Sequence, residues 1–157
     1  MKPLRWLTRA AALLCLALSL AAPVRAEGLL MARSQQMFPE AMTTLQNAIT
    51  ARGYTITRLQ EVNENLAKMH FKSDMYRVVF FGRYDQIDAL TRRYPELIPY
   101  LPLSITIFAE GNQSIVVAMP PRALEEMFPD PALRPVFEGW QRDYQAIFDR
   151  VRETTGF

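Results

Sequence analysis

Hydrophobic residues follow a helical spacing in three parts of the chain. Within residues 38–49 they recur every three or four positions, which is the pattern of a helix with one buried face. Residues 85–94 repeat this pattern more briefly and stop before Pro95. A longer stripe covers residues 133–151, and Pro135 must lie in its first turn, because a proline further in would clash with the preceding turn. We therefore predict two shorter helices and one long C-terminal helix.

Other segments alternate between apolar and polar residues, or are apolar throughout, as strands do. The predicted strands are residues 29–34, 54–59, 76–81, 103–109 and 115–119. The last two are joined by Glu110, Gly111 and Asn112, a turn sequence typical of a hairpin. The third is apolar on both sides apart from Arg77, which predicts a central strand covered on both faces. Residues 62–69 fit either a helical turn or a loop.

This order of elements predicts the fold class. It reads strand, helix, strand, strand, helix, hairpin, helix, which is typical of a two-layer α+β sandwich. We expect a mostly antiparallel sheet of four to five strands with the helices chiefly on one face. The uncovered face would leave Tyr54, Thr106 and Phe108 near solvent. Such a face is a natural place to form a dimer or to bind a flat ligand.

The first 26 residues have the layout of a secretory signal peptide. Basic residues precede an apolar run over residues 10–22, and Val24 and Ala26 place small residues at the −3 and −1 positions of a cleavage site. The run is shorter than the ~20 residues that a membrane-spanning helix needs, which argues against an uncleaved anchor. We expect cleavage after Ala26 and a periplasmic or secreted protein without further membrane association. Residues 27–157 are expected to form a single domain.

Removal of this segment changes the charge and the cysteine content. The full chain has 18 basic and 16 acidic residues, and four of the basic ones precede the cleavage site: Lys2, Arg5, Arg9 and Arg25. The remainder then has 14 basic residues (18 − 4) against 16 acidic ones, so its net charge is −2 and a nucleic-acid partner is disfavoured. The sole cysteine, Cys15, also leaves with the signal peptide. The exported chain therefore has neither a disulfide nor a thiol nucleophile.

Several segments in a fixed order resemble one bacterial family, the domain of unknown function 302. These segments are KSDMYRVVFFG at 72–82, PELIPYLPL at 95–103, IFAEG at 107–111, MPP at 119–121 and PALRPV at 131–136. The likeness covers residues 38–153 and implies a small α+β sandwich that can associate as a homodimer. It implies no established reaction. Many relatives carry cysteines near two positions where this chain has Arg83-Tyr84 and Leu103-Ser104, so no thiol-based role is expected here.

The densest group of polar residues leads into the third predicted strand. Its members Lys72, Asp74, Tyr76 and Arg77 are candidate ligand-binding residues. Arg77 needs an anionic or carbonyl partner, because an unpaired buried charge is costly. A carboxylate of the chain itself, such as Asp74 or Glu110, is the preferred partner. The alternative is a small anionic ligand held by the guanidinium group.

His70 is the only histidine of the chain. Together with Met69 and Met75 it could bind copper or haem iron, since imidazole and thioether groups are ligands of both. The preferred interpretation is a solvent-facing histidine with the two methionines in the core, because metal sites usually have three or four ligands. The cofactor is thus unknown: the preferred expectation is that there is none, and haem or copper is the alternative.

The proline-rich segment at 95–102 presents apolar side chains with little loss of entropy, which suits a pocket wall or a dimer contact. A rigid crossover packed on its own domain is an equally good interpretation. Tyr100 of this segment is the fifth candidate ligand-binding residue. The stripe formed by Trp140, Tyr144 and Phe148 is assigned to the core because of its regular helical spacing.

No sequence motif points to catalysis. The chain has no nucleophile elbow, no metalloprotease motif and no phosphate-binding loop. We therefore expect an exported, non-catalytic module, homodimeric, that binds a small ligand or a periplasmic partner protein. A haem or copper protein that uses His70 is the first alternative. A small hydrolase or isomerase without a recognisable motif is the second.

Overall fold

A computed structural model describes residues 28–155, and the predicted signal peptide lies outside the described residues. Five strands form one antiparallel sheet in the order β1-β5-β4-β3-β2. Their bounds are β1 Leu30–Ser34, β2 Thr55–Glu61, β3 Tyr76–Gly82, β4 Leu103–Glu110 and β5 Gln113–Ala118. All five predicted strands are therefore present, close to their predicted positions. Strands β4 and β5 form the predicted hairpin, with Gly111 at a positive φ of 60° in its turn.

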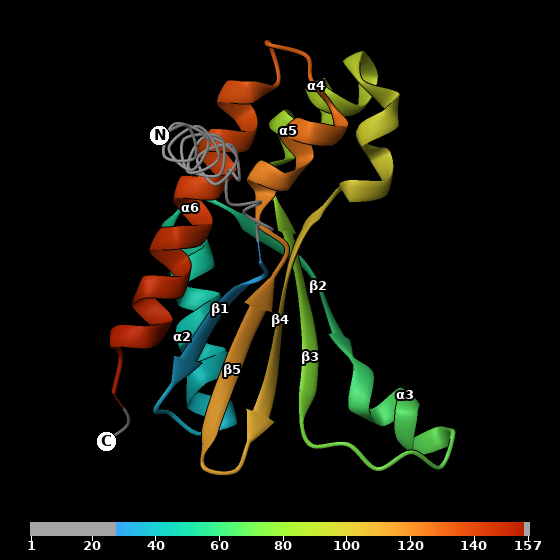
Figure 1. Cartoon of the computed structure of the whole chain (residues 1–157). Coiled ribbons are helices and arrows are strands. Elements are labelled where there is room, and N and C mark those ends of the chain that lie inside the picture. The colour runs from blue at the N-terminus through green and yellow to red at the C-terminus, as the bar shows by residue number, and fades with distance from the viewer. Residues whose placement is uncertain (1–27, 156–157) are drawn as a thin grey trace, which may run out of the picture.

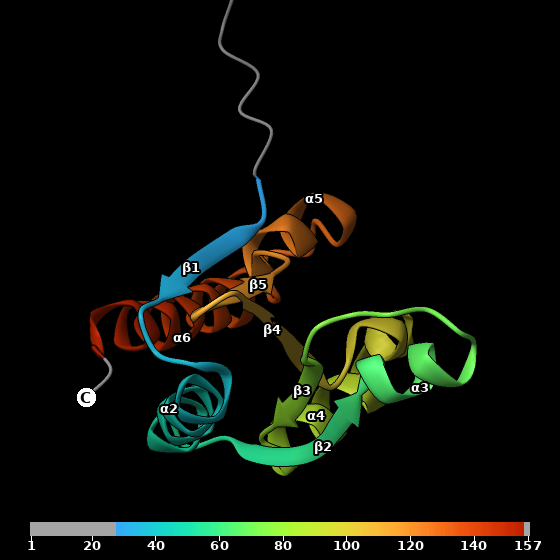
Figure 2. The same cartoon turned by 90° about the horizontal axis from the view of Figure 1, so that it is seen from below.

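The helices divide into two groups and one isolated element. Figures 1 and 2 show α2 and α6 side by side on one face of the sheet, while the shorter helices gather at one end of it. Helix α3 stands apart beyond β2 and β3. The bounds are α2 Phe38–Ala51, α3 Val62–Lys68, α4 Tyr84–Arg93, η1 Pro95–Tyr100, η2 Pro121–Ala123, α5 Leu124–Met127 and α6 Arg134–Glu153.

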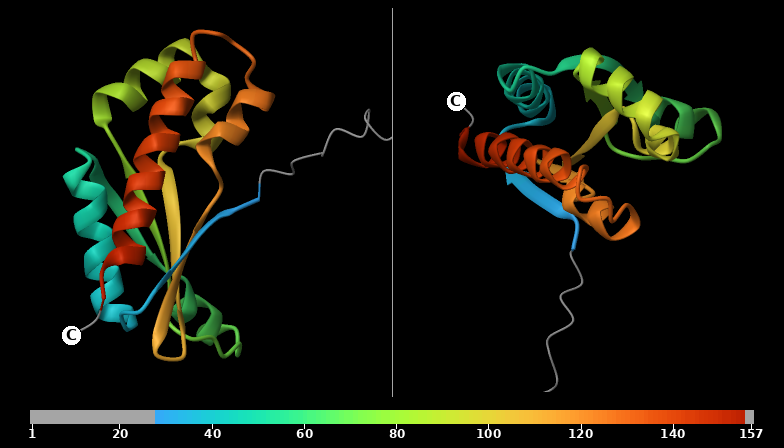
Figure 3. Two further views of the ribbon diagram at one scale, coloured as in Figure 1. Left: turned by 60° about the vertical axis from the view of Figure 1, so that its left-hand side comes forward. Right: turned by 90° about the horizontal axis from the view of Figure 1, so that it is seen from above.

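This arrangement confirms the predicted α+β sandwich with its long C-terminal helix. Pro135 lies in the first turn of α6, as the sequence requires. The ambiguous segment at 62–69 is the short helix α3. Figure 3 shows α6 running along the sheet beside α2, so that these two helices form the second layer. Among residues 28–155, no helix combines the length and apolar character needed to cross a membrane.

The core lies between the sheet and the pair α2–α6. Alternate residues of the inner strands point into it, and α6 contributes its apolar stripe. Its largest fully buried side chains are Trp140, Phe81, Phe137, Leu45, Ile49, Leu97, Ile105, Ile107, Leu133, Ile147, Val79 and Val116. Trp140, Tyr144 and Phe148 are at most 3 % exposed, which confirms their assignment to the core. The indole N–H of Trp140 donates to Gln86 Oε1 at 2.9 Å and so joins α6 to α4.

The prediction that residues 76–81 are covered on both faces is wrong. Val79 and Phe81 point towards the helices and are fully buried, whereas Tyr76, Val78 and Phe80 on the other face are only half-buried. The strand has an apolar second face without a helix to cover it. The sequence shows correctly that both faces of this strand are apolar. A partly exposed apolar face, however, has the same sequence pattern as a buried one.

Candidate functional site

The sheet face that points away from α2 and α6 is called the open face here. Strand pairing places the side chains of Thr106 and Phe108 on it beside Val117 of β5 and Tyr76 of β3. Met31 of the edge strand β1 lies opposite Val117 and is on the same face. Thr106 and Phe108 are only half-buried, which agrees with the prediction that they lie near solvent.

A concavity of about 540 Å³ lies on the open face near the start of β3. Its lining residues are Ser73, Asp74, Tyr76, Thr106, Phe108, Ala109 and Val117. Apolar side chains from β4 and β5 form part of its lining, while hydroxyl groups and the Asp74 carboxylate supply hydrogen-bonding groups. The volume lies in the range of about 300–1,000 Å³ that small-molecule sites occupy. This combination suits a ligand with an apolar body and a donor or cationic group.

The predicted ligand-binding residues are divided among different places. Asp74 and Tyr76 line the open-face concavity together. Lys72 lies in a separate concavity of about 610 Å³ beside α3. Tyr100 lines a third of about 280 Å³, between the proline-rich segment and η2, and it packs edge-on against Phe128 at 5.4 Å. Arg77 lines none of these three. The predicted cluster therefore contributes two of its members to one site.

His70 follows α3 in a left-handed turn with φ of 63°, and it lines the concavity beside α3 with Lys72 and Phe71. Met69 and Met75 do not line this concavity, and they are 65 % and 49 % exposed. The expectation that the methionines lie in the core is therefore wrong. Within residues 28–155, no group of three or more His, Cys, Asp or Glu side chains is arranged to hold a metal ion. A copper or haem site at His70 stays a prediction from sequence.

Arg77 points to the helix side of the sheet, and its side chain is 17 % exposed. Its guanidinium group forms an ion pair with Glu61 Oε1 at 3.2 Å and donates to Asn63 Oδ1. It also lies 6.0 Å from the ring centre of Phe38. The expected partner type, a carboxylate of the chain itself, is confirmed. The two suggested residues are wrong, since Glu110 pairs with Arg33 and no ion pair joins Arg77 to Asp74 in the described part of the chain.

Replacement of Arg77 should therefore affect stability rather than ligand binding. We expect Arg77→Ala to lower the free energy of unfolding by about 1–3 kcal/mol, because Asn63 and Glu61 lose a charged partner. Urea denaturation measures this loss. Arg92→Ala is the control, because the Arg92 side chain is 78 % exposed and pairs with Asp88 on its own helix. An equal loss in both variants would contradict the role assigned to Arg77.

Sequence reasoning missed the most connected polar group of the fold, which centres on Asp143 of α6. Asp143 Oδ1 accepts from Arg52 Nε at 2.9 Å, and Oδ2 accepts from the Tyr54 hydroxyl at 2.7 Å and from Arg83 at 3.0 Å. The Arg83 guanidinium group also lies 3.9 Å from the ring centre of Tyr54. The prediction that Tyr54 lies near solvent is wrong, because the residue is 4 % exposed on the core side. A carboxylate inside the apolar stripe of α6 was the available signal.

The environment of this group shifts two pKa values. Burial alone would raise the pKa of Asp143, but hydrogen bonds from Tyr54, Arg52 and Arg83 outweigh it and hold the pKa below its ordinary value. Burial, together with the Asp143 carboxylate, raises the pKa of Tyr54. The group therefore holds an ionised aspartate beside a neutral tyrosine. Both carboxylate oxygens are occupied, which indicates a structural role rather than a site for a ligand.

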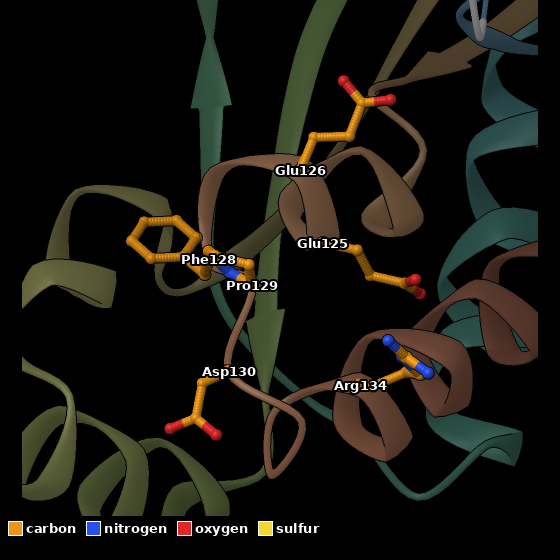
Figure 4. A pocket seen from close by; sticks show the side chains of 6 residues that line it. All are labelled: Glu125, Glu126, Phe128, Pro129, Asp130 and Arg134. Atoms are coloured by element: carbon orange, nitrogen blue, oxygen red, sulfur yellow. The ribbon is translucent and has the colours of Figure 1, made fainter.

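A smaller cavity of about 190 Å³ lies between α5 and α6. Figure 4 shows Glu125 and Arg134 pointing towards one another across it, while Glu126 and Asp130 point away. The Oε1 atom of Glu125 is buried without a hydrogen-bond partner in the described part of the chain. The cavity is smaller than a typical small-molecule site and is lined largely by charged residues. The open-face concavity is therefore the stronger candidate.

Comparisons with known proteins agree with this fold. A family model described as a domain of unknown function, DUF302, matches residues 31–151. The crystal structure of an uncharacterised conserved DUF302 protein from Bacillus stearothermophilus is similar, with a TM-score of 0.73 and 17 % sequence identity. The similarity covers 81 % of this chain and 100 % of that one. No curated protein matches the chain.

Proposed function

The chain belongs to the DUF302 family, and on that premise we propose that it is an exported, non-catalytic binding module whose site is the concavity on the open face. The single observation that carries the proposal is the composition of this concavity. It combines an apolar surface from Phe108 and Val117 with the hydroxyl groups of Tyr76 and Thr106 and the carboxylate of Asp74. Export is proposed from the signal-peptide pattern of residues 1–26 alone.

The charge at the site selects the class of ligand. Asp74 is the charged residue that lines the concavity, and Lys72 and Arg77, which suggested an anionic ligand, lie outside it. Phe108 and Tyr76 offer aromatic rings, which attract cations, beside that carboxylate. We therefore propose a small ligand with an apolar body and an amine or other cationic group. A homodimer is also proposed, on the strength of the resemblance and of the apolar open face.

A pair of fluorescent probes tests the proposed site. Dansylcadaverine and dansylglycine share one apolar fluorophore but carry an amine and a carboxylate respectively. We expect dansylcadaverine to bind more tightly, and Asp74→Asn to weaken its binding by up to about fivefold while leaving dansylglycine unaffected, because an exposed charge pair is worth about 0–1 kcal/mol. Fluorescence titration measures both affinities. Equal affinity for the two probes would contradict the proposed ligand class.

A second variant tests whether the probe binds in the open-face concavity. Thr106→Trp should fill the space and weaken dansylcadaverine binding by at least tenfold. Thr43→Trp is the matched control, because it makes the same change at an exposed residue of α2 that does not line the concavity. Unchanged binding in the Thr106 variant would show that the probe binds elsewhere.

A further inference from the structure

Two of the concavities described above lie at opposite ends of the same two strands, β3 and β4, which run side by side in Figure 1. Tyr76 of β3 is paired with Phe108 of β4, and both line the open-face concavity. Phe80 and Ser104 are the pair at the other end, and both line the concavity of about 280 Å³ beside the proline-rich segment, here called the proline-rich concavity. All four side chains lie on the open face, because alternate residues of a strand share one face.

A continuous row of side chains joins the two concavities. Val78 and Thr106 form the middle pair of this row, between the two pairs just described. All six side chains of the row are half-buried, and none of them is charged. From Tyr76 to Phe80 the strand rises by about 14 Å, at about 3.4 Å per residue, and the two strands lie about 5 Å apart. The row therefore has the length and width to hold one extended hydrocarbon chain.

The two ends of the row differ in charge. Asp74 lines the open-face concavity, whereas none of the described residues that line the proline-rich concavity is charged. Arg58 of the edge strand β2 pairs with Phe80 and therefore lies on the open face at that second end. Arg58 is exposed and forms no ion pair within residues 28–155. A cationic group is thus attracted to the Asp74 end and repelled at the other, so the charges define a direction along the row.

We propose that the ligand is a free single-chain cationic amphiphile, a long-chain alkylamine. Its amine lies beside Asp74, and its chain runs along the row into the proline-rich concavity, where Pro99, Tyr100 and Met119 form an apolar wall around the end of the chain. An exposed charge pair contributes little to affinity, whereas each methylene group adds about fourfold when it is fully removed from water. Affinity therefore depends mainly on the length of the chain. The inference rests on the proposed function, because the amine binds in the open-face concavity.

Displacement of dansylcadaverine by butylamine, octylamine and dodecylamine tests the length of the ligand. The protein is expressed from the full-length chain and purified as the cell processes it, and the amines are used below the concentrations at which they aggregate. If the row removes about half of each methylene group from water, each adds about twofold, and dodecylamine should bind at least about 100-fold more tightly than butylamine. A gain below about tenfold would overturn this inference and leave the open-face concavity as the proposed site.

Variants of the proline-rich concavity test where the chain lies. Ser104→Trp should fill this concavity and weaken dodecylamine binding at least about tenfold while leaving butylamine binding unchanged, and Thr43→Trp again serves as the control. Met119→Ser is a milder change at a residue that is 46 % exposed, and it should weaken dodecylamine binding several-fold. Its matched control is Met37→Ser, at a residue that is 56 % exposed and lies outside this concavity. Unchanged dodecylamine binding in the Ser104 and Met119 variants would overturn the proposed course of the chain.

The α,ω-diamine of dodecane tests the direction of the chain. Its second amine would lie near Arg58, so the diamine should bind the wild type more weakly than dodecylamine does. Arg58→Glu should strengthen diamine binding several-fold but change dodecylamine binding by less than about twofold, because the single amine lies more than a Debye length away. An equal gain for both amines would overturn the proposed direction. A wild type that binds neither dansyl probe overturns the proposed site and this inference together.

Discussion

Replacement of Asp143 by alanine should lower the free energy of unfolding by about 2–4 kcal/mol. Its side chain is 12 % exposed and accepts hydrogen bonds from Arg52, Arg83 and Tyr54. Removal of the carboxylate takes away the hydrogen-bond acceptor of the buried Tyr54 hydroxyl and the ion pairs of both arginines. The expected loss is below that of a fully buried pair because the two arginine side chains are 43 % and 36 % exposed, so water can solvate them. Urea denaturation at pH 7 measures the difference.

The pH dependence of this loss identifies the ionised carboxylate as its cause. The pKa of Asp143 is lower in the folded protein than in the unfolded chain, where it is about 3.9. Its stabilising contribution is therefore fully present above about pH 5 and is lost as the pH falls through the folded-state pKa. Asp143→Asn is nearly isosteric and should be less stable than the wild type at pH 7, with a difference that shrinks below about pH 4. A difference that is constant from pH 7 to pH 2 would contradict this explanation.

Replacement of Phe81 by alanine should have the largest effect, a loss of about 3–5 kcal/mol in the free energy of unfolding. Phe81 is fully buried on the helix side of β3. Its ring lies edge-on to Tyr54 at 5.1 Å and 5.8 Å from Tyr144 of α6. The alanine variant leaves a cavity between the sheet and both helices, and it also removes these aromatic contacts. Thermal or urea denaturation measures the loss.

The neighbouring residue on the same strand provides the matched control. Phe80 has the same chemistry but points to the open face and is only half-buried. Phe80→Ala should therefore cost about 1–2 kcal/mol, in proportion to the smaller area that it removes from water. If the two variants were equally destabilised, the open face would be as tightly packed as the core, and its assignment as a binding surface would be wrong.

Much of the fold could be predicted because local patterns determine it. The apolar stripe of α6 has the period of a helix, and the alternation in β4 has the period of a strand. The hairpin turn at Gly111 requires a residue that tolerates positive φ. Whether other elements cover both faces of a strand was less predictable. Residues 76–81 are apolar on both sides whether a helix covers the second face or not, so periodicity could not show that β3 has an open face.

The site was less predictable than the fold because it depends on contacts distant in sequence. Asp74 and Tyr76 were recognised as candidates, but the residues that complete their concavity come from β4 and β5. Arg77 and Asp74 are close in sequence, yet the strand direction sends Arg77 to the helix side, where Glu61 meets it. Asp143 was missed because its partners Arg52 and Arg83 are 91 and 60 residues away along the chain. No residue spacing in the sequence predicts a contact between residues so far apart along the chain.

Hydroxyl-radical footprinting of methionines tests most directly whether the open face is the contact surface of this protein. Met31 on the open face is 58 % exposed in the single chain, and Met37 and Met127 elsewhere are similarly exposed at 56 % and 47 %. If the open face is covered in the proposed homodimer, Met31 should oxidise several-fold more slowly than Met37 and Met127. Equal oxidation rates at all three methionines would contradict this assignment.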